Sequence, residues 1–229
     1  ENSIDETYGF DNNITAGFVE ADVIFSKDLA LKLGVRADYS SIFKSTDVAP
    51  RAALAYKSSK NGQFSLAYGN FYQNPNSSIL KFESDLKSQK TSHYILNYQY
   101  VNDGKIFRAE AYRKDYDNLI KFDTAFEGFD SNFNASGDGY AQGLDFFWRD
   151  NTSIKNIDYW LSYSYLDTQR DYRNYTTSAQ PNYATKHNLS IVGKYWIDQW
   201  KSQVGMSYGF SSGRPYTNPN TSKFLSERT

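Results

Sequence analysis

The sequence contains 229 residues, with 25 basic and 26 acidic side chains, a formal net charge of −1 and no cysteine. The balanced charge excludes a strong attraction to nucleic acid, and the lack of cysteine excludes disulfides, thiolate metal sites and cysteine nucleophiles. No apolar run approaches the roughly 18 residues of a membrane-spanning helix, and no signal peptide opens the chain, so we expect a mature, trimmed or excised chain.

Ten strands are predicted along the chain. Most are longer than the usual soluble strand of about 5–6 residues and match the roughly 9–11 residues of a tilted membrane-crossing strand. The predicted strands cover residues 14–26, 29–40, 50–58, 63–72, 91–101, 105–117, 139–149, 156–167, 186–197 and 200–211.

The predicted connections alternate between short and long. The first, third, fifth, seventh and ninth are short turns, whereas the intervening connections cover 41–49, 73–90, 118–138 and 168–185. Short periplasmic turns and long extracellular loops on opposite sides of a membrane are typical of outer-membrane barrels.

Aromatic side chains are abundant in a chain that is polar on average. There are 20 Tyr, 16 Phe and 4 Trp residues but only one Met, and the mean hydropathy is −0.70. This composition suits alternating strands with one apolar face, as in a transmembrane barrel. An aromatic-rich carbohydrate-binding sandwich has a similar composition, so composition alone leaves both open.

Residues 29–39, LALKLGVRADY, alternate between apolar and polar side chains with a period of two. This pattern indicates a strand with one dry face and one wet face. Rings concentrate toward the strand ends: Tyr94 and Tyr98 flank Leu96, for example. Aliphatic centres with aromatic ends predict contact with lipid, because interfacial rings form belts at both membrane surfaces. The sequence therefore predicts an all-β, antiparallel transmembrane β-barrel.

Charged residues on the wet face are predicted to line the lumen. The tight turn at 26–28 is expected to bring Asp22 near Lys32 as a structural ion pair, although contact with material inside the lumen is the alternative. The predicted lumen-lining charges are Glu20, Asp22, Lys32, Arg36, Asp38, Arg108, Glu110 and Asp145.

Several stretches resemble the barrel of TonB-dependent outer-membrane receptors, particularly the Bacteroidetes type. APRAALAYK, FSLAYGNFYQNP, AEAYRKDYDNLIKF, GYAQGLDFFWRD, WLSYSYLDT, ATKHNLSIVGKYW and YGFSSGRPYTNP follow one another in the family's order. GYAQGLDFF and SSGRPYT are the most distinctive of them. The resemblance covers roughly residues 50 to 219.

This resemblance implies a location in the bacterial outer membrane and active import of an extracellular nutrient. Barrels of this family have about 22 strands, so we expect residues 1–229 to form part of a barrel, without plug, TonB-contacting box or final strand. The implied partners are outer-membrane lipid, the protein's own plug domain, the TonB complex and a surface lipoprotein lid. The implied cargo is siderophore-iron, a vitamin, an oligosaccharide or a peptide. A passive porin or structural surface barrel is the alternative, and a soluble carbohydrate-binding sandwich is a further one.

Candidate ligand-binding residues lie in the long loops and at the rim. RDYRNY, residues 170–175, combines arginines with tyrosines and suits charge-assisted bonds and stacking, although an ordinary surface loop or lipopolysaccharide contact has the same composition. Phenylalanines such as Phe126 are apolar for an exposed loop. The candidates are Tyr72, Gln73, Phe129, Phe133, Arg170, Tyr172, Arg173 and Tyr175.

Metal, cofactor and catalytic chemistry are not expected. Residues 130–139, DSNFNASGDG, resemble a calcium loop, but Ala135 stands where glycine is required and Ala141 where glutamate is required. His93 and His187 are expected to be structural caps. No nucleophile elbow, phosphate loop or HExxH motif is present, so the sequence does not predict an enzyme.

Overall fold

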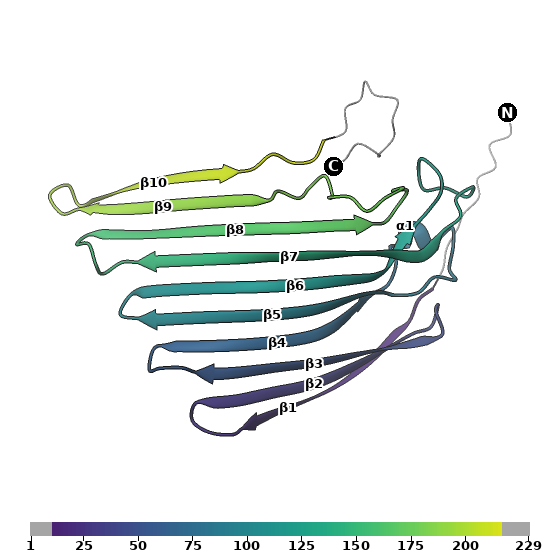
Figure 1. Cartoon of the computed structure of the whole chain (residues 1–229), viewed down its shortest axis with the longest axis horizontal. Coiled ribbons are helices and arrows are strands. Elements are labelled where there is room, and N and C mark those ends of the chain that lie inside the picture. The colour runs from purple at the N-terminus through teal and green to yellow at the C-terminus, as the bar shows by residue number, and fades with distance from the viewer. Residues whose placement is uncertain (1–10, 217–229) are drawn as a thin grey trace.

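The computed structural model describes residues 11–216. Ten antiparallel strands form one sheet in chain order, so each strand pairs with its neighbours in the sequence (Figure 1). Among these residues, no helix has the length and apolar character needed to cross a membrane. The elements are β1 (Ile14–Ile24), β2 (Leu29–Ser40), β3 (Ser45–Lys57), β4 (Gly62–Gln73), α1 (Ser77–Leu80), β5 (Gln89–Asn102), β6 (Lys105–Lys121), β7 (Asn134–Asp150), β8 (Ile157–Asp171), β9 (His187–Ile197) and β10 (Ser202–Ser211).

All ten predicted strands are present. The predicted alternation of short and long connections is wrong for the second connection, which is short. β3 begins at Ser45 rather than at residue 50, so the connection is only 41–44. Residues 45–50 pair with β2 alone, and pairing with β4 starts at Arg51. Pro50 lacks an N–H group and occupies the last position before that second pairing begins, where no ladder bond to β4 is lost. It therefore sits inside the strand.

The remaining connections follow the predicted two-sided arrangement. The five odd-numbered turns gather at one end of the sheet, on the left in Figure 1, and the long connections 74–88, 122–133 and 172–186 gather at the other. We call these the turn end and the loop end. β6 and β7 are each 17 residues long, so the predicted loop 118–138 shortens to 122–133.

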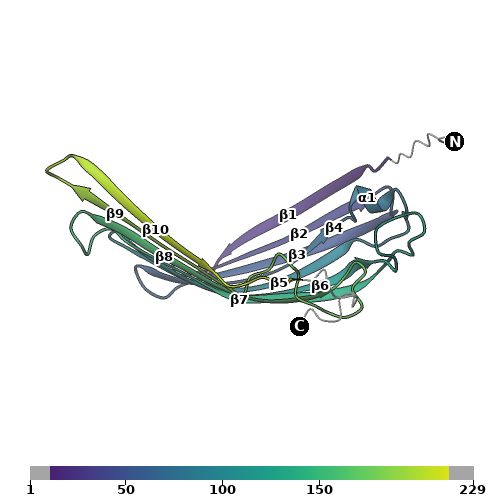
Figure 2. The ribbon, with the colours of Figure 1, turned by 90° about the horizontal axis from the view of Figure 1, so that it is seen from above.

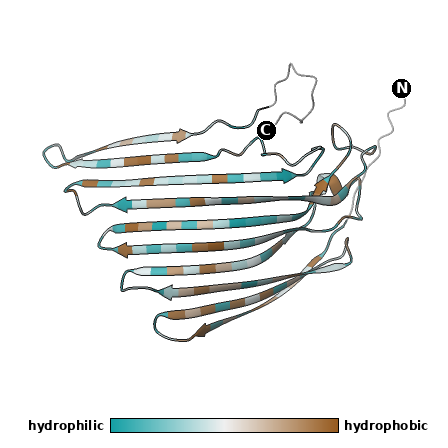
Figure 3. Ribbon diagram, viewed as in Figure 1, coloured by the Kyte–Doolittle hydropathy of each residue, from teal (hydrophilic) through white to brown (hydrophobic). Residues whose placement is uncertain are grey.

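The pairing register sorts side chains onto two chemically distinct faces. Leu31 lies opposite Leu54, and Leu54 lies opposite Leu66. Leu66 in turn lies opposite Leu96. Directly paired residues project from the same side of a sheet, so these leucines define an apolar face. The opposite side, which carries Lys32 and Glu110, is the polar face. Brown and pale or teal bands alternate along the strands accordingly (Figure 3).

The apolar face has no protein layer over it. Leu66 is 52% exposed and Met206 is 75% exposed, and Leu33, which a sandwich would bury, is 44% exposed. A single sheet of ten strands accounts for the whole β structure of the described residues. The alternative of a soluble β-sandwich is therefore wrong, because that fold packs two sheets through their apolar faces.

An aromatic belt lies on the turn-end side of the leucine row. Phe64 and Tyr98 have ring centroids 4.6 Å apart, and Tyr98 lies 6.2 Å from Phe107. Phe107 is 6.3 Å from Trp148, which extends the belt across four strands. Rings of this kind occupy the polar–apolar boundary of transmembrane barrels.

The apolar band crosses the strands obliquely. On the loop-end side of the leucine row, Tyr68 and Tyr94 have ring centroids 5.2 Å apart. Farther along the same row, Tyr94 pairs with Arg113 and Arg113 with Gln142, so the apolar face becomes polar in β6 and β7. In β2 it stays apolar as far as Tyr39. A band inclined to the strands is expected when strands tilt by about 35–45° in the membrane. The sheet is also curved: seen from above, β1 and β10 slope in opposite directions (Figure 2).

Arginine substitutions on the two faces of β4 should have unequal costs. We expect Leu66→Arg to destabilise the complete barrel by about 2–4 kcal/mol, because it places a cation in hydrocarbon, whereas Ser65→Arg should cost much less. Urea unfolding in lipid vesicles measures both values. Equal costs at the two positions would contradict the assignment of the faces.

Candidate functional site

The eight predicted lumen charges all lie on the polar face. In β1 and β2, Lys32 Nζ is 3.6 Å from Glu20 Oε2 and 3.9 Å from Asp22 Oδ1. The predicted proximity of Asp22 and Lys32 is confirmed, and the two residues are directly paired in the register. Arg36 Nη2 is 2.6 Å from Asp38 Oδ1 within the same strand. The side chains of Lys32, Glu20 and Asp22 are largely exposed, so water and salt screen their ion pairs strongly.

Two carboxylates face each other at the centre of the polar face. Glu110 of β6 lies directly opposite Asp145 of β7. Asn97 Nδ2 donates to Glu110 Oε2 at 3.3 Å, and Arg108 Nε donates to Gln99 Oε1 at 3.1 Å. Two opposed carboxylates with no ion pair of their own in residues 11–216 favour a cationic group above this part of the wall.

A second group of polar-face residues was not singled out from the sequence. Arg149 donates to Asp158 through Nε at 3.0 Å and Nη2 at 2.8 Å. The Trp160 ring lies between Arg149 and Lys194, whose charged groups are 5.9 Å and 5.1 Å from its centroid. Their positions at alternate residues of β7, β8 and β9 are the sequence signal that identifies them.

Tyr72 and Gln73 lie on opposite faces of the sheet. They are neighbours in β4 and pair with Lys90 and Gln89, respectively. Successive side chains of a strand point to opposite faces. Gln73 therefore belongs to the polar face, whereas Tyr72 belongs to the apolar face at its loop end.

The RDYRNY segment is a packed part of the rim rather than a free loop. Arg173 N–H donates to the Ile120 carbonyl at 2.7 Å, and Phe122 N–H donates to the Arg173 carbonyl at 3.1 Å. The Tyr172 and Tyr175 rings are 5.0 Å apart, and Tyr175 is only 8% exposed. Burial, with a smaller effect from Tyr175, raises the pKa of Tyr172.

Arg170 is held between aromatic rings. Its guanidinium carbon is 4.2 Å from the Tyr116 centroid and 5.9 Å from that of Tyr183. Arg173, by contrast, is exposed, with its guanidinium 5.4 Å from the Tyr172 ring. Of the predicted ligand residues in this segment, Arg173 is the one whose charged group is most accessible.

The two predicted loop phenylalanines lie in different environments. Phe133 packs against a small core of Ile79, Leu86 and Ile120 that joins α1 to the end of β6. Phe129 is 67% exposed and meets the Phe82 ring edge-on at 4.7 Å. The outer loops thus have an apolar core of their own, with Phe129 at its outer surface.

The segment that resembles a calcium loop does not adopt that form. Residues from Asn134 onward belong to β7, so their side chains alternate between two faces. No group of three or more histidine, aspartate or glutamate side chains with metal-binding geometry occurs in residues 11–216. Asp123 instead accepts the Asn132 N–H at 2.9 Å, and hydrogen bonds from Asn132 lower the pKa of Asp123.

The two histidines lie at different places in their strands. His187 is the first residue of β9, and its Nδ1 lies 2.9 Å from the Tyr163 hydroxyl, which fits a role at the strand end. His93 lies within β5, on the polar face, with its ring 4.5 Å from that of Phe71. His93 is therefore not an end cap.

A family model for the TonB-dependent receptor-like β-barrel matches residues 2–228. The chain belongs to this family. No curated protein matches the chain. Solved structures with the same fold include the FrpB iron transporter of Neisseria meningitidis, at 12% identity and a TM-score of 0.67, covering 85% of this chain and 32% of that one.

Two further solved structures are similar. The ferric enterobactin receptor PfeA of Pseudomonas aeruginosa has 13% identity and a TM-score of 0.69, covering 90% of this chain and 33% of the receptor. The outer-membrane transporter YddB of Escherichia coli has 12% identity and a TM-score of 0.69, with coverages of 93% and 36%. This TonB-dependent receptor barrel chain therefore spans about a third of their length, and its location is the bacterial outer membrane.

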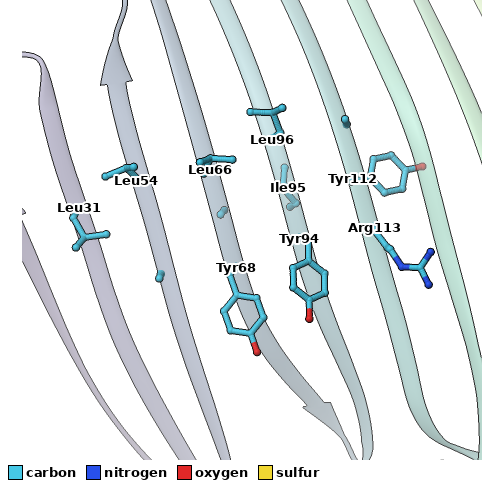
Figure 4. Close-up of a pocket in the computed structure, with 12 residues that line it drawn as sticks. Leu31, Leu54, Leu66, Tyr68, Tyr94, Ile95, Leu96, Tyr112 and Arg113 are labelled. Carbon is cyan, nitrogen blue, oxygen red and sulfur yellow. The ribbon is translucent and has the colours of Figure 1, made fainter.

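One hollow of this receptor chain lies on the apolar face. It has a volume of about 590 Å³ and is bordered by the leucine row together with Tyr68 and Tyr94 (Figure 4). In a barrel of this family that face contacts lipid, so acyl chains rather than a transported solute fill the hollow. The surfaces available to a solute are the polar face and the loop end.

The loop anchored by Asp123 should loosen in acid. Because the folded-state pKa of Asp123 is depressed, its anchoring is present above the ordinary carboxyl pKa of 3.8 and is lost as the pH falls below that value. A spin label at Phe126→Cys, unique because the chain has no cysteine, should become more mobile over that range. Asp123→Ala should be mobile at every pH, and Glu127→Ala should resemble the parent. A label whose mobility does not respond to pH or to Asp123→Ala would contradict this role.

Proposed function

We propose that this chain is a section of the barrel wall of an active outer-membrane importer. The observation that carries the proposal is the single sheet with one exposed apolar face and one charged face, within a family of transport receptors. The outer strands β1 and β10 each pair on one side only in the described residues. Hydrocarbon does not tolerate unpaired strand edges. In this proposal, further strands of the same barrel therefore pair with the free edges of β1 and β10.

The importer requires partners beyond the barrel wall. We propose a plug domain inside the barrel and the TonB complex as the energy source, on the strength of family membership. The carboxylates of Glu110 and Asp145 suit a cationic group of such a plug. The exposed rings of Phe126 and Phe129 suit contact with a surface lipoprotein lid.

The proposed cargo is a bulky ferric siderophore. Two of the similar solved structures are named for iron or a ferric complex, which supports this class over a vitamin, oligosaccharide or peptide. At the loop end, Arg173 and Tyr172 place a cation beside a ring. This pair suits an anionic aromatic chelate, because it offers both charge-assisted hydrogen bonds and stacking.

Uptake should be energised and nutrient-specific. Deleting the parent gene should abolish growth on a ferric siderophore as sole iron source, and collapsing the proton gradient should stop uptake of the labelled chelate without preventing its binding. Uptake that continues in de-energised cells would support a passive porin instead. If the deletion strain grows normally on the ferric siderophore but poorly on a vitamin or an oligosaccharide, the cargo is that nutrient and not a siderophore.

Arg173 should contribute to ligand capture. We expect Arg173→Ala to raise the half-saturating ligand concentration by about tenfold, since a charge-assisted hydrogen bond is lost. Lys186→Ala, an exposed cation of the same loop, is the matched control and should leave it unchanged. Binding of labelled chelate to whole cells measures the half-saturating concentration for both variants. Equal values for the two variants would contradict a role of Arg173 in ligand binding.

A further inference from the structure

The polar face contains a hollow of about 230 Å³ between β1 and β5, separate from the loop end. Its floor consists of small residues, Gly34, Ala53, Ala67 and Gly69. Ile95, on β5, adds an apolar wall. A cavity of this size, smaller than the usual drug-sized pocket of about 300–1,000 Å³, suits a small group with an apolar body.

Arg51 stands between two glycines in this hollow. Gly34 of β2 and Gly69 of β4 are its direct partners in the register. A Cβ atom on Gly69 would lie 3.2 Å from the Phe71 ring and 3.4 Å from Arg51 Cγ, and one on Gly34 would lie 3.2 Å from Glu20 Cγ. Gly69 therefore keeps open the space beside the Arg51 side chain, and Gly34 keeps open the space beside Glu20.

The Arg51 guanidinium lies over the Phe71 ring and, in the described part of the chain, lacks a carboxylate partner within ion-pair distance. Its carbon lies 5.0 Å from the Phe71 centroid, and the Phe71 ring lies 4.5 Å from that of His93. Lys32, Arg36 and Arg149 on the same face each have a carboxylate within ion-pair distance, whereas Arg51, like Arg108 and Lys57, has none among residues 11–216. Glu20, the acidic residue that borders the hollow, pairs with Lys32 instead.

We propose that Arg51 and this hollow form a seat for one carboxylate attached to an apolar or aromatic body. The planar guanidinium suits two parallel hydrogen bonds to the two carboxylate oxygens. The attached body would pack against Ala53, Ala67 and Ile95. The carboxylate comes either from a free acid inside the barrel or from an aspartate or glutamate of the chain segment that fills it. This seat does not depend on the identity of the cargo.

Benzoate is the probe for the free acid. In the complete receptor in detergent, calorimetric titration should show saturable benzoate binding, and Arg51→Gln should weaken it by about tenfold. Lys57→Gln, a cation on the same face of the same strand, is the control and should bind like the parent. Benzamide, which has no charge, should bind far more weakly, and Glu20→Gln should retain or strengthen benzoate binding because it removes a like charge.

Ion conductance through the receptor tests whether the carboxylate comes from the chain segment that fills the barrel. If the filling segment occupies the seat, the parent receptor does not bind benzoate, and Arg51→Gln raises its ion conductance in planar bilayers while Lys57→Gln does not. The proposal is overturned if Arg51→Gln alters neither benzoate binding nor conductance relative to Lys57→Gln. Both measurements work without uptake or an energised membrane, so their outcome is independent of whether the import function holds.

Discussion

The architecture depends on one constraint: the strands must satisfy their backbone hydrogen bonds among themselves while half of their side chains meet hydrocarbon. A sheet meets this requirement because all its pairing lies within the layer, leaving both faces free. The leucine row from Leu31 to Leu96 then needs no protein cover, since lipid provides it. The absence of a second β layer over residues 11–216 and the exposure of Leu66 both follow from this constraint.

The same alternation that supplies a lipid face obliges every other side chain to meet water. Charges on the polar face are consequently managed within the wall. Lys32 is shared between two carboxylates, and Arg149 is held by a two-bond contact to Asp158. Charges without such a partner, among them Arg51 and the opposed carboxylates of β6 and β7, give the wall a pattern that a complementary occupant can recognise.

At the loop end the constraint changes, because strands that leave the membrane can be covered by protein. β6 and β7 extend past the apolar band and support a small core around Ile79 and Ile120, with a bulge in their pairing after Tyr116. The backbone of Arg173 joins this extension through residues 120 and 122. The rim is therefore built on the strands themselves, which gives its exposed side chains fixed positions.

Period-two alternation, strand length and ring placement were sufficient to predict the ten strands, the lipid-facing side and the ion pair of Asp22 with Lys32, because each of these is a local property of a strand and its neighbour across a short turn. The tertiary structure alone decided that β3 continues through Pro50, because the cost of a missing N–H depends on whether a second strand is paired there. It also decided that Tyr175 is buried and that Arg51 stands between two glycines. These outcomes depend on register and on contacts between loops distant in the chain, which a single sequence does not encode locally.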